Sequence, residues 1–226
     1  MSGKHAMTYA AQRIAWIDFE TTGLVDVPDQ PAWPLVLEVA LVVTCSRLKV
    51  LDAREFVIKT PPEKLFGECD GKSYLNDFTR EMHTKNGLIR ELEAGAGKGI
   101  AEVDVILYSI LAEHEVEIEV ERDGKTELKP YKPVLGGASP GALDRPILRK
   151  YFPLTNSALS HRSLDVSTLK LAFRNWFDGP LGEVDSKDEA EHRAMADTLA
   201  AIRFASIYRD AIGRIPLPES SKVAPV

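Results

Sequence analysis

An apolar run that ends on two carboxylates, IAWIDFE at residues 14–20, sets the strongest limit on how this chain can fold. The run predicts a buried strand. The sequence TTGL that follows predicts a turn, in which Gly23 can take a backbone conformation that other residues resist. Side chains two residues apart on a strand point to the same side of the sheet. We therefore expect Asp18 and Glu20 to share one face, while Phe19 points into the core on the other.

The order of the remaining elements indicates the fold class. Further strands are expected at VLEVALVVTC (36–45) and LDAREFVIKT (51–60), and they are followed by helices that alternate with short strands. This order is typical of an α/β protein whose sheet mixes parallel and antiparallel pairing. Strict alternation of polar and apolar residues around Asp123-Gly124 predicts an exposed β-hairpin at residues 115–131.

Length and composition bound the organisation of the chain. Its 226 residues fit one domain, which we expect at residues 13–213 between a disordered leader (1–12) and a disordered tail (214–226). No apolar run reaches the roughly 18–20 residues that span a bilayer, and the two cysteines form no C-x-x-C motif. We therefore expect a cytoplasmic protein without membrane contact. The net charge of −6 argues against a protein that coats long nucleic acid, although bound metal can supply positive charge locally.

Four acids suggest a metal site. Carboxylates as close as Asp18 and Glu20 raise each other's pKa or need a cation between them, and Mg²⁺ prefers such oxygens. Asp144 follows a loop rich in glycine and proline, and Asp197 lies among apolar helix residues, where an unpaired carboxylate is costly. These acids could meet around paired metal ions, which cleave phosphodiesters. The competing interpretation is solvated acids at a strand end, with Asp144 as an ordinary helix N-cap.

His192 is a candidate proton acceptor near these acids. On a continuous helix, His192 and Asp197 would point about 140° apart, so both face one site only if His192 precedes the helix. The sequence SKDE at 186–189 matches a capping box and would start the helix earlier. We favour a mobile loop that runs to about His192, whose imidazole suits proton transfer from water. The competing interpretation is a solvated histidine at a helix terminus.

Three motifs carry a family resemblance. DFETTGL, LDRPIL and HRAMAD occur in this order and resemble the motifs of the DEDDh 3′→5′ exonuclease superfamily. Within it, IAWIDFETTGL, MHTKNGL, DRPILRKYFP, LDVSTLK and HRAMADTLAAI resemble the oligoribonuclease family over most of residues 13–211. The resemblance implies an RNase H-like core, a mixed five-stranded sheet flanked by helices, with residues 115–131 as an inserted hairpin. It also implies a homodimer.

The same resemblance implies roles for individual side chains. The ligands of two divalent ions, Mg²⁺ or Mn²⁺, would be Asp18, Glu20, Asp144 and Asp197, and His192 would be the general base. The residues expected to bind substrate are Leu24 and Phe78 against the bases, His83 nearby, and Arg162 and Ser167 on the 5′ phosphate from the dimer mate. Phe78 stands where the family usually has tryptophan, and a phenylalanine ring can also stack on a base.

The implied activity is metal-dependent 3′→5′ hydrolysis of short single-stranded oligonucleotides, with RNA as the expected substrate, to nucleoside 5′-monophosphates. Two alternatives remain open. One is a DNA-directed proofreading or repair exonuclease with the same chemistry, from which contacts to the 2′-hydroxyl would distinguish it. The other is a catalytically silent nucleic-acid-binding module, against which the presence of all five expected catalytic residues argues.

Overall fold

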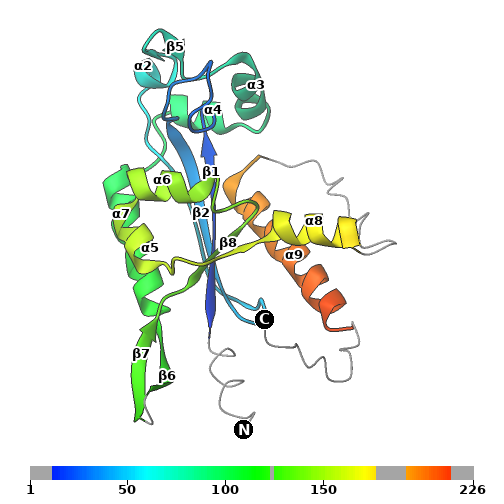
Figure 1. The fold of residues 1–226 in the computed structure, drawn as a ribbon. Coiled ribbons are helices and arrows are strands. Elements are labelled where there is room, and N and C mark those ends of the chain that lie inside the picture. The colour runs from blue at the N-terminus through cyan, green and yellow to red at the C-terminus, as the bar shows by residue number, and fades with distance from the viewer. Residues whose placement is uncertain (1–11, 123–124, 177–191, 215–226) are drawn as a thin grey trace.

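The computed structural model describes residues 12–122, 125–176 and 192–214. A five-stranded sheet lies at its centre (Figure 1). Across the sheet, the strands are β3 (Val50–Val57), β2 (Val36–Cys45), β1 (Arg13–Thr21), β8 (Val134–Gly137) and β9 (Ser163–Asp165). The first three pair antiparallel, whereas β8 and β9 pair parallel to their neighbours. The predicted mixed five-stranded sheet is confirmed.

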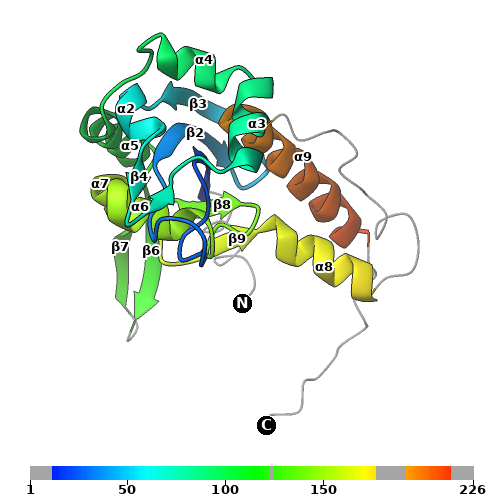
Figure 2. The same ribbon diagram turned by 90° about the horizontal axis from the view of Figure 1, so that it is seen from above.

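Two layers of helices cover the two faces of the sheet (Figures 1 and 2). One face carries α5 (Ile100–Glu113), α6 (Asp144–Tyr151) and α7 (Pro153–Ala158), and the other carries α8 (Val166–Trp176) and α9 (Ala194–Ile212). The pleat of β1 divides its apolar side chains between them. Ala15 and Ile17 pack in the first layer, whereas Ile14 and Trp16 pack in the second.

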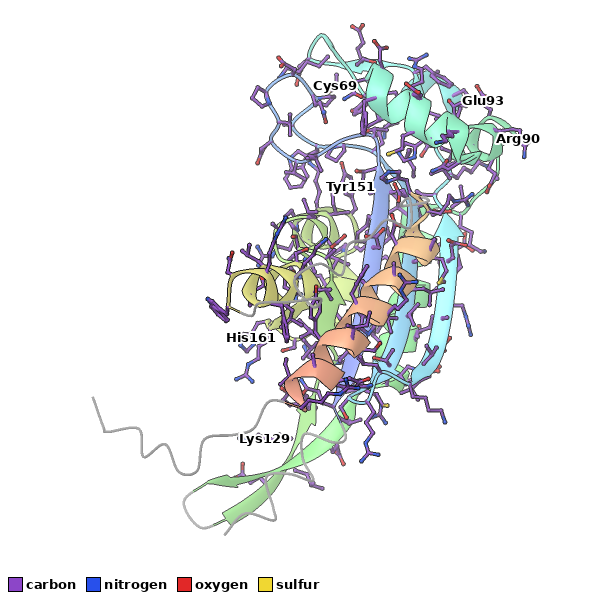
Figure 3. The ribbon with its side chains drawn as sticks, turned by 90° about the vertical axis from the view of Figure 1, so that its right-hand side faces the viewer. Cys69, Arg90, Glu93, Lys129, Tyr151 and His161 are labelled. Carbon is purple, nitrogen blue, oxygen red and sulfur yellow. The ribbon has the colours of Figure 1, made fainter. Side chains whose placement is uncertain are left out.

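A third apolar cluster closes the end of the sheet at which β1 finishes. Its buried residues belong to α2 (Pro62–Leu65), α4 (Leu88–Glu93), the segment before α3 (Asp77–Lys85) and the start of β2. The helices α2, α3 and α4 lie together at this end of the sheet with the short pair β4 (Glu68–Cys69) and β5 (Lys72–Ser73) (Figure 1). We call this group the cap. Figure 3 places Arg90 and Glu93 in the cap, at the opposite end of the molecule from Lys129.

The predicted hairpin at 115–131 is confirmed as β6 (Val116–Arg122) and β7 (Lys125–Tyr131), and it projects from the end opposite the cap (Figures 1 and 3). The strand expected at 51–60 ends earlier, at Val57. The chain leaves the sheet there because Lys59 N–H donates to the carbonyl of Lys98, at the entry to α5.

The folded domain expected at residues 13–213, between a leader and a tail, stays a prediction. The predicted leader and tail fall outside the described residues, except for Gln12 and Arg214. Within the described part of the chain, no helix is both long and apolar enough to cross a membrane.

Candidate active site

The two carboxylates of β1 lie on one face, as predicted. Phe19, between them, points to the opposite layer, where its ring centroid lies 5.2 Å from that of Phe152. Among the described residues, Asp18, Glu20 and Asp197 form a cluster whose carboxylate oxygens lie within 4.8 Å of one another. The end of β1 and the first turn of α9 therefore bring three carboxylates close enough together to bind a metal ion.

The start of α9 explains how Asp197 and His192 can serve one site. The helix begins at Ala194, so His192 precedes it, as the sequence predicts. His192 has a φ of 48°, which is uncommon for a residue with a side chain, and the Asn86 side-chain amide donates to its carbonyl oxygen. The capping-box sequence SKDE at 186–189, and the loop expected before His192, lie outside the described residues.

Asp144 approaches the cluster from the other helical layer. It is the first residue of α6, where Leu143 is the N-cap, so the interpretation of Asp144 as an ordinary N-cap is wrong. Asp144 is buried, and burial together with the charge of Asp18 raises its pKa, against hydrogen bonds from the backbone of Asp144 and Phe19. Asp144 is not part of the tight group of three, yet it lies close enough to interact with it.

The acids are crowded and poorly solvated. Burial, followed by the charges of Asp197 and Glu38, raises the pKa of Asp18 to about 7. Burial, followed by the charges of Asp18, Asp197 and Glu38, raises the pKa of Glu20 to about 8, although Arg193 acts in the opposite direction. Ionising such a group is unfavourable without a neighbouring positive charge. A hard divalent cation fits this donor set, because it prefers several carboxylate oxygens.

His83, predicted to lie near the substrate, is a fully buried residue beside Glu20. Its Nε2 lies 3.0 Å from the carbonyl oxygen of Thr21 and its Nδ1 lies 4.0 Å from Glu20 Oε2. Because a carbonyl only accepts, Nε2 carries the proton. Burial is the main cause that lowers the pKa of His83, and Nδ1, which makes no hydrogen bond to the described residues, faces Glu20. His83 therefore contacts the acidic cluster from behind.

Leu24 and Phe78 expose their apolar side chains, as contact with bases would require. Leu24 follows β1 and is 54% exposed, and Phe78 lies in the first turn of α3 and is 71% exposed. The backbone N–H of Leu24 donates to Gln30 Oε1 at 3.0 Å, so the following loop holds this residue in place. Neither side chain contributes to the core.

A cavity of about 330 Å³ adjoins the acids between α8, α9 and the loop after β8. Asp18 and Asp197 lie on its wall together with Ser167 and Lys170, and the rest of the lining is mainly apolar. The structure therefore places Ser167 beside the acids of its own chain, whereas the resemblance implied a role across the dimer. Arg162 is exposed and is not part of the lining.

Comparisons with known proteins identify the family. No protein-family model matches the chain. An oligoribonuclease of Leifsonia xyli is 31% identical over 205 residues, which cover 91% of this chain and 86% of that protein. The mitochondrial oligoribonuclease of Homo sapiens is 31% identical over 213 residues, which cover 94% and 78%. The chain belongs to the oligoribonuclease family.

Solved structures agree on the fold. Escherichia coli exonuclease I in complex with single-stranded DNA superposes with a TM-score of 0.60 at 16% identity over 90% of this chain. The chain spans 41% of the length of that protein, and the likeness shows a shared RNase H-like fold. The oligoribonuclease relatives, and not the solved structures, confirm the family resemblance of the sequence motifs.

One element of the site was not anticipated from the sequence. Glu38 lies next to the acids and forms an ion pair with Arg193. Glu38 had a visible signal, because it is the one charged residue in the apolar strand VLEVALVVTC. Its partner lies 155 positions further along the chain, so the pairing was not readable from local pattern.

Proposed function

We propose that this protein is a metal-dependent 3′→5′ exonuclease that hydrolyses short single-stranded oligonucleotides to nucleoside 5′-monophosphates, with RNA as its main substrate. The observation that carries the proposal is the cluster of Asp18, Glu20 and Asp197, two of which line a cavity, in a chain of the oligoribonuclease family. Burying acids whose pKa values are raised lowers the stability of the fold, so these acids are expected to serve a function. Metal-assisted phosphodiester hydrolysis is a reaction that needs such a group of carboxylates.

Four carboxylates would hold the ions of this site, which we propose to be two Mg²⁺ or Mn²⁺: Asp18, Glu20, Asp144 and Asp197. Bound divalent ions would supply Lewis acidity to the attacking water and to the phosphodiester oxygens. A carboxylate oxygen of Asp18 lies within 4.8 Å of one from Glu20 and one from Asp197, and the charge of Asp18 also reaches Asp144. Asp18 would therefore hold the ions together with each of the other three acids.

His192 would accept the proton of the attacking water. It lies before the first turn of α9, and the electrostatic effect of its charge on buried His83 supports a place near the acids. An imidazole that is within reach of the water typically contributes roughly 10²–10⁴-fold to the rate. His192→Ala is therefore expected to lower kcat by that factor while leaving Mn²⁺ binding intact.

The substrate would lie across the exposed side chains near the acids. Leu24 and Phe78 would contact the bases, and Ser167 with Arg162 would bind the terminal phosphate. Lys170 adds a cation to the cavity that the sequence motifs did not assign. The preference for RNA comes from the oligoribonuclease relatives, whereas DNA as the substrate would follow the exonuclease I complexes.

The oligomeric state and the cellular location complete the proposal. A homodimer is supported by the family resemblance and by Leu171 and Trp176 of α8, which are 58% and 77% exposed. A cytoplasmic location is supported by the two free cysteines, Cys45 and Cys69. Light scattering of the purified protein and fractionation of cells test these features.

The decisive assay compares labelled RNA and DNA oligomers from two to about twenty nucleotides, with Mg²⁺, Mn²⁺ or a chelator. We expect metal-dependent release of mononucleotides from short RNA, and none from the Asp18→Ala variant. Glu93→Gln, which changes an exposed acid of α4, is the matched control and should behave as wild type. Wild-type turnover by Asp18→Ala would refute the site. Binding without turnover on every oligomer would instead favour the silent module.

A further inference from the structure

A buried ion pair lies next to the acids and has no part in the mechanism above. Glu38 of β2 is 0% exposed and stands directly opposite Glu20 across the strand pair. The Arg193 guanidinium donates to both of its oxygens, with Nη2 2.6 Å from Oε1 and Nε 3.1 Å from Oε2. A fully buried carboxylate persists only with such partners.

Arg193, the residue after His192, connects the start of α9 to the sheet and to the cap. Its Nη2 contacts Glu38 in the sheet, and its Nη1 donates to Glu91 Oε1 in the cap at 2.9 Å. The preceding residue, His192, is tied to the cap by Asn86. His192 has a positive φ, and a backbone held in a sparsely populated conformation needs surrounding contacts that enforce it.

The same pair determines where α9 begins. Among the described residues, the N-cap Arg193 makes no side-chain capping bond to its helix. Instead, Glu38 Oε2 accepts from the N–H of Ala194 at 2.9 Å, and Glu55 of β3 accepts from the N–H of Met195 at 3.1 Å. The strands therefore supply the caps that a helix usually takes from its own N-terminal side chains.

This anchoring matters for Asp197 because it lies one turn into α9. Each residue of an α-helix turns the side chain by about 100°, so a slip of one residue would carry Asp197 away from Asp18 and Glu20. An ion pair of this kind is a poor source of stability, since well-packed apolar residues of similar volume often stabilise a fold equally well. The desolvation cost of burying this ion pair is better explained by the position that the pair imposes on the start of α9.

We propose that Glu38 and Arg193 are a positioning pair, which holds His192 and Asp197 in register with the acids of β1. The inference rests on the proposed nuclease function. It assigns these two residues no contact with substrate or metal. Their contribution passes through the start of α9 and the backbone of His192.

The test replaces the pair by apolar residues of similar size, Glu38→Leu with Arg193→Met. We expect the double variant to unfold at a urea midpoint close to that of wild type, measured in chelator. Its kcat should nevertheless fall roughly 10–100-fold, with KM changed by less than about threefold, because a small displacement of reacting groups costs that much. Its Kd for Mn²⁺ should rise about tenfold, since Asp197 is displaced.

The matched control is Lys98→Met with Glu102→Leu, which removes a surface ion pair between the residue before the N-cap of α5 and its first turn, and it should leave kcat and the Mn²⁺ affinity unchanged. If the double variant fails to fold, Arg193→Lys is measured instead. Lysine keeps the charge but loses the forked contact, so kcat should fall about 3–10-fold at an unchanged unfolding midpoint.

The outcomes separate the two proposals. Wild-type kcat together with wild-type Mn²⁺ affinity in the folded variants would overturn the positioning role. A loss of kcat that merely follows the loss of folded protein would overturn it as well. Absence of turnover in the wild type would refute the nuclease function, and a tenfold loss of Mn²⁺ affinity in the double variant would still support the positioning pair.

Discussion

Replacing Asp18 by asparagine is expected to stabilise the metal-free protein at alkaline pH while abolishing turnover. Asparagine has nearly the same shape as aspartate but carries no charge. In the folded protein, burial and the charges of Asp197 and Glu38 raise the pKa of Asp18 to about 7, from an ordinary value of 3.8. The folded state therefore resists the ionisation that the unfolded chain accepts freely.

The sign and size of the effect follow from proton linkage. Between pH 4 and 7, the folded protein holds a proton on Asp18 that the unfolded chain has lost, so the contribution of Asp18 to the free energy of unfolding falls as the pH rises and levels off above about 7. The two pKa values correspond to a loss of roughly 4 kcal/mol at pH 8. The substitution removes this loss, but burying the neutral amide of asparagine costs part of the same amount. The expected net gain in the free energy of unfolding for Asp18→Asn is roughly 2–3 kcal/mol, or about 5–10 °C in Tm.

The assay is thermal and urea unfolding of both proteins at pH 5 and pH 8, first in chelator and then in Mn²⁺. Wild type should lose stability from pH 5 to pH 8 in chelator, and Asp18→Asn should lose roughly 2–3 kcal/mol less over the same range. Glu20 and Asp144, whose pKa values are also raised mainly by burial, keep a slope of the same sign in the variant. With Mn²⁺ at about 100 times its Kd, wild type should gain roughly 2.7 kcal/mol and the variant little. A variant that melts below wild type at pH 8 in chelator would refute the reasoning.

Three further substitutions test other parts of the structure. Phe78→Ala should leave the free energy of unfolding within about 0.5 kcal/mol of wild type, because the ring is 71% exposed, but should raise KM about tenfold in steady-state assays by removing a stacking contact. Asp104→Ala should cost roughly 2–4 kcal/mol in urea unfolding with kcat unchanged, since its buried carboxylate accepts two backbone N–H groups at the start of α7. Gly136→Ala should lower Tm, at a cost of roughly 1–3 kcal/mol, because the added methyl group would lie 2.8 Å from the Trp16 ring. Normal stability of either buried variant would contradict the packing described.

Local pattern predicted the features that depend on neighbours in the chain. The alternation in IAWIDFE placed Asp18 and Glu20 on one face, because the pleat has a fixed period of two. The 3.6-residue period of a helix similarly required His192 to precede α9, which begins at Ala194. The hairpin at 115–131 followed from the alternation of its polar and apolar residues around the dipeptide Asp-Gly in the sequence.

Features that depend on distant contacts were not readable. The strand expected to reach residue 60 ends at Val57, because the backbone then pairs with Lys98. The role of Glu38 depends on Arg193, and the cavity depends on the approach of α8 to α9. Such pairings are set by the tertiary fold, whereas periodicity reports only which side of an element is buried.

The four acids come from the sheet and from both helical layers, with Asp18 and Glu20 on β1, Asp144 on α6 and Asp197 on α9. The divalent ions that these acids would hold would link the three layers beside the end of β1. Amide hydrogens of α6 and α9 should then exchange with solvent more slowly on metal loading, and in the same concentration range. A substitution that loosens either helix would then also weaken metal binding by the acid on the other helix.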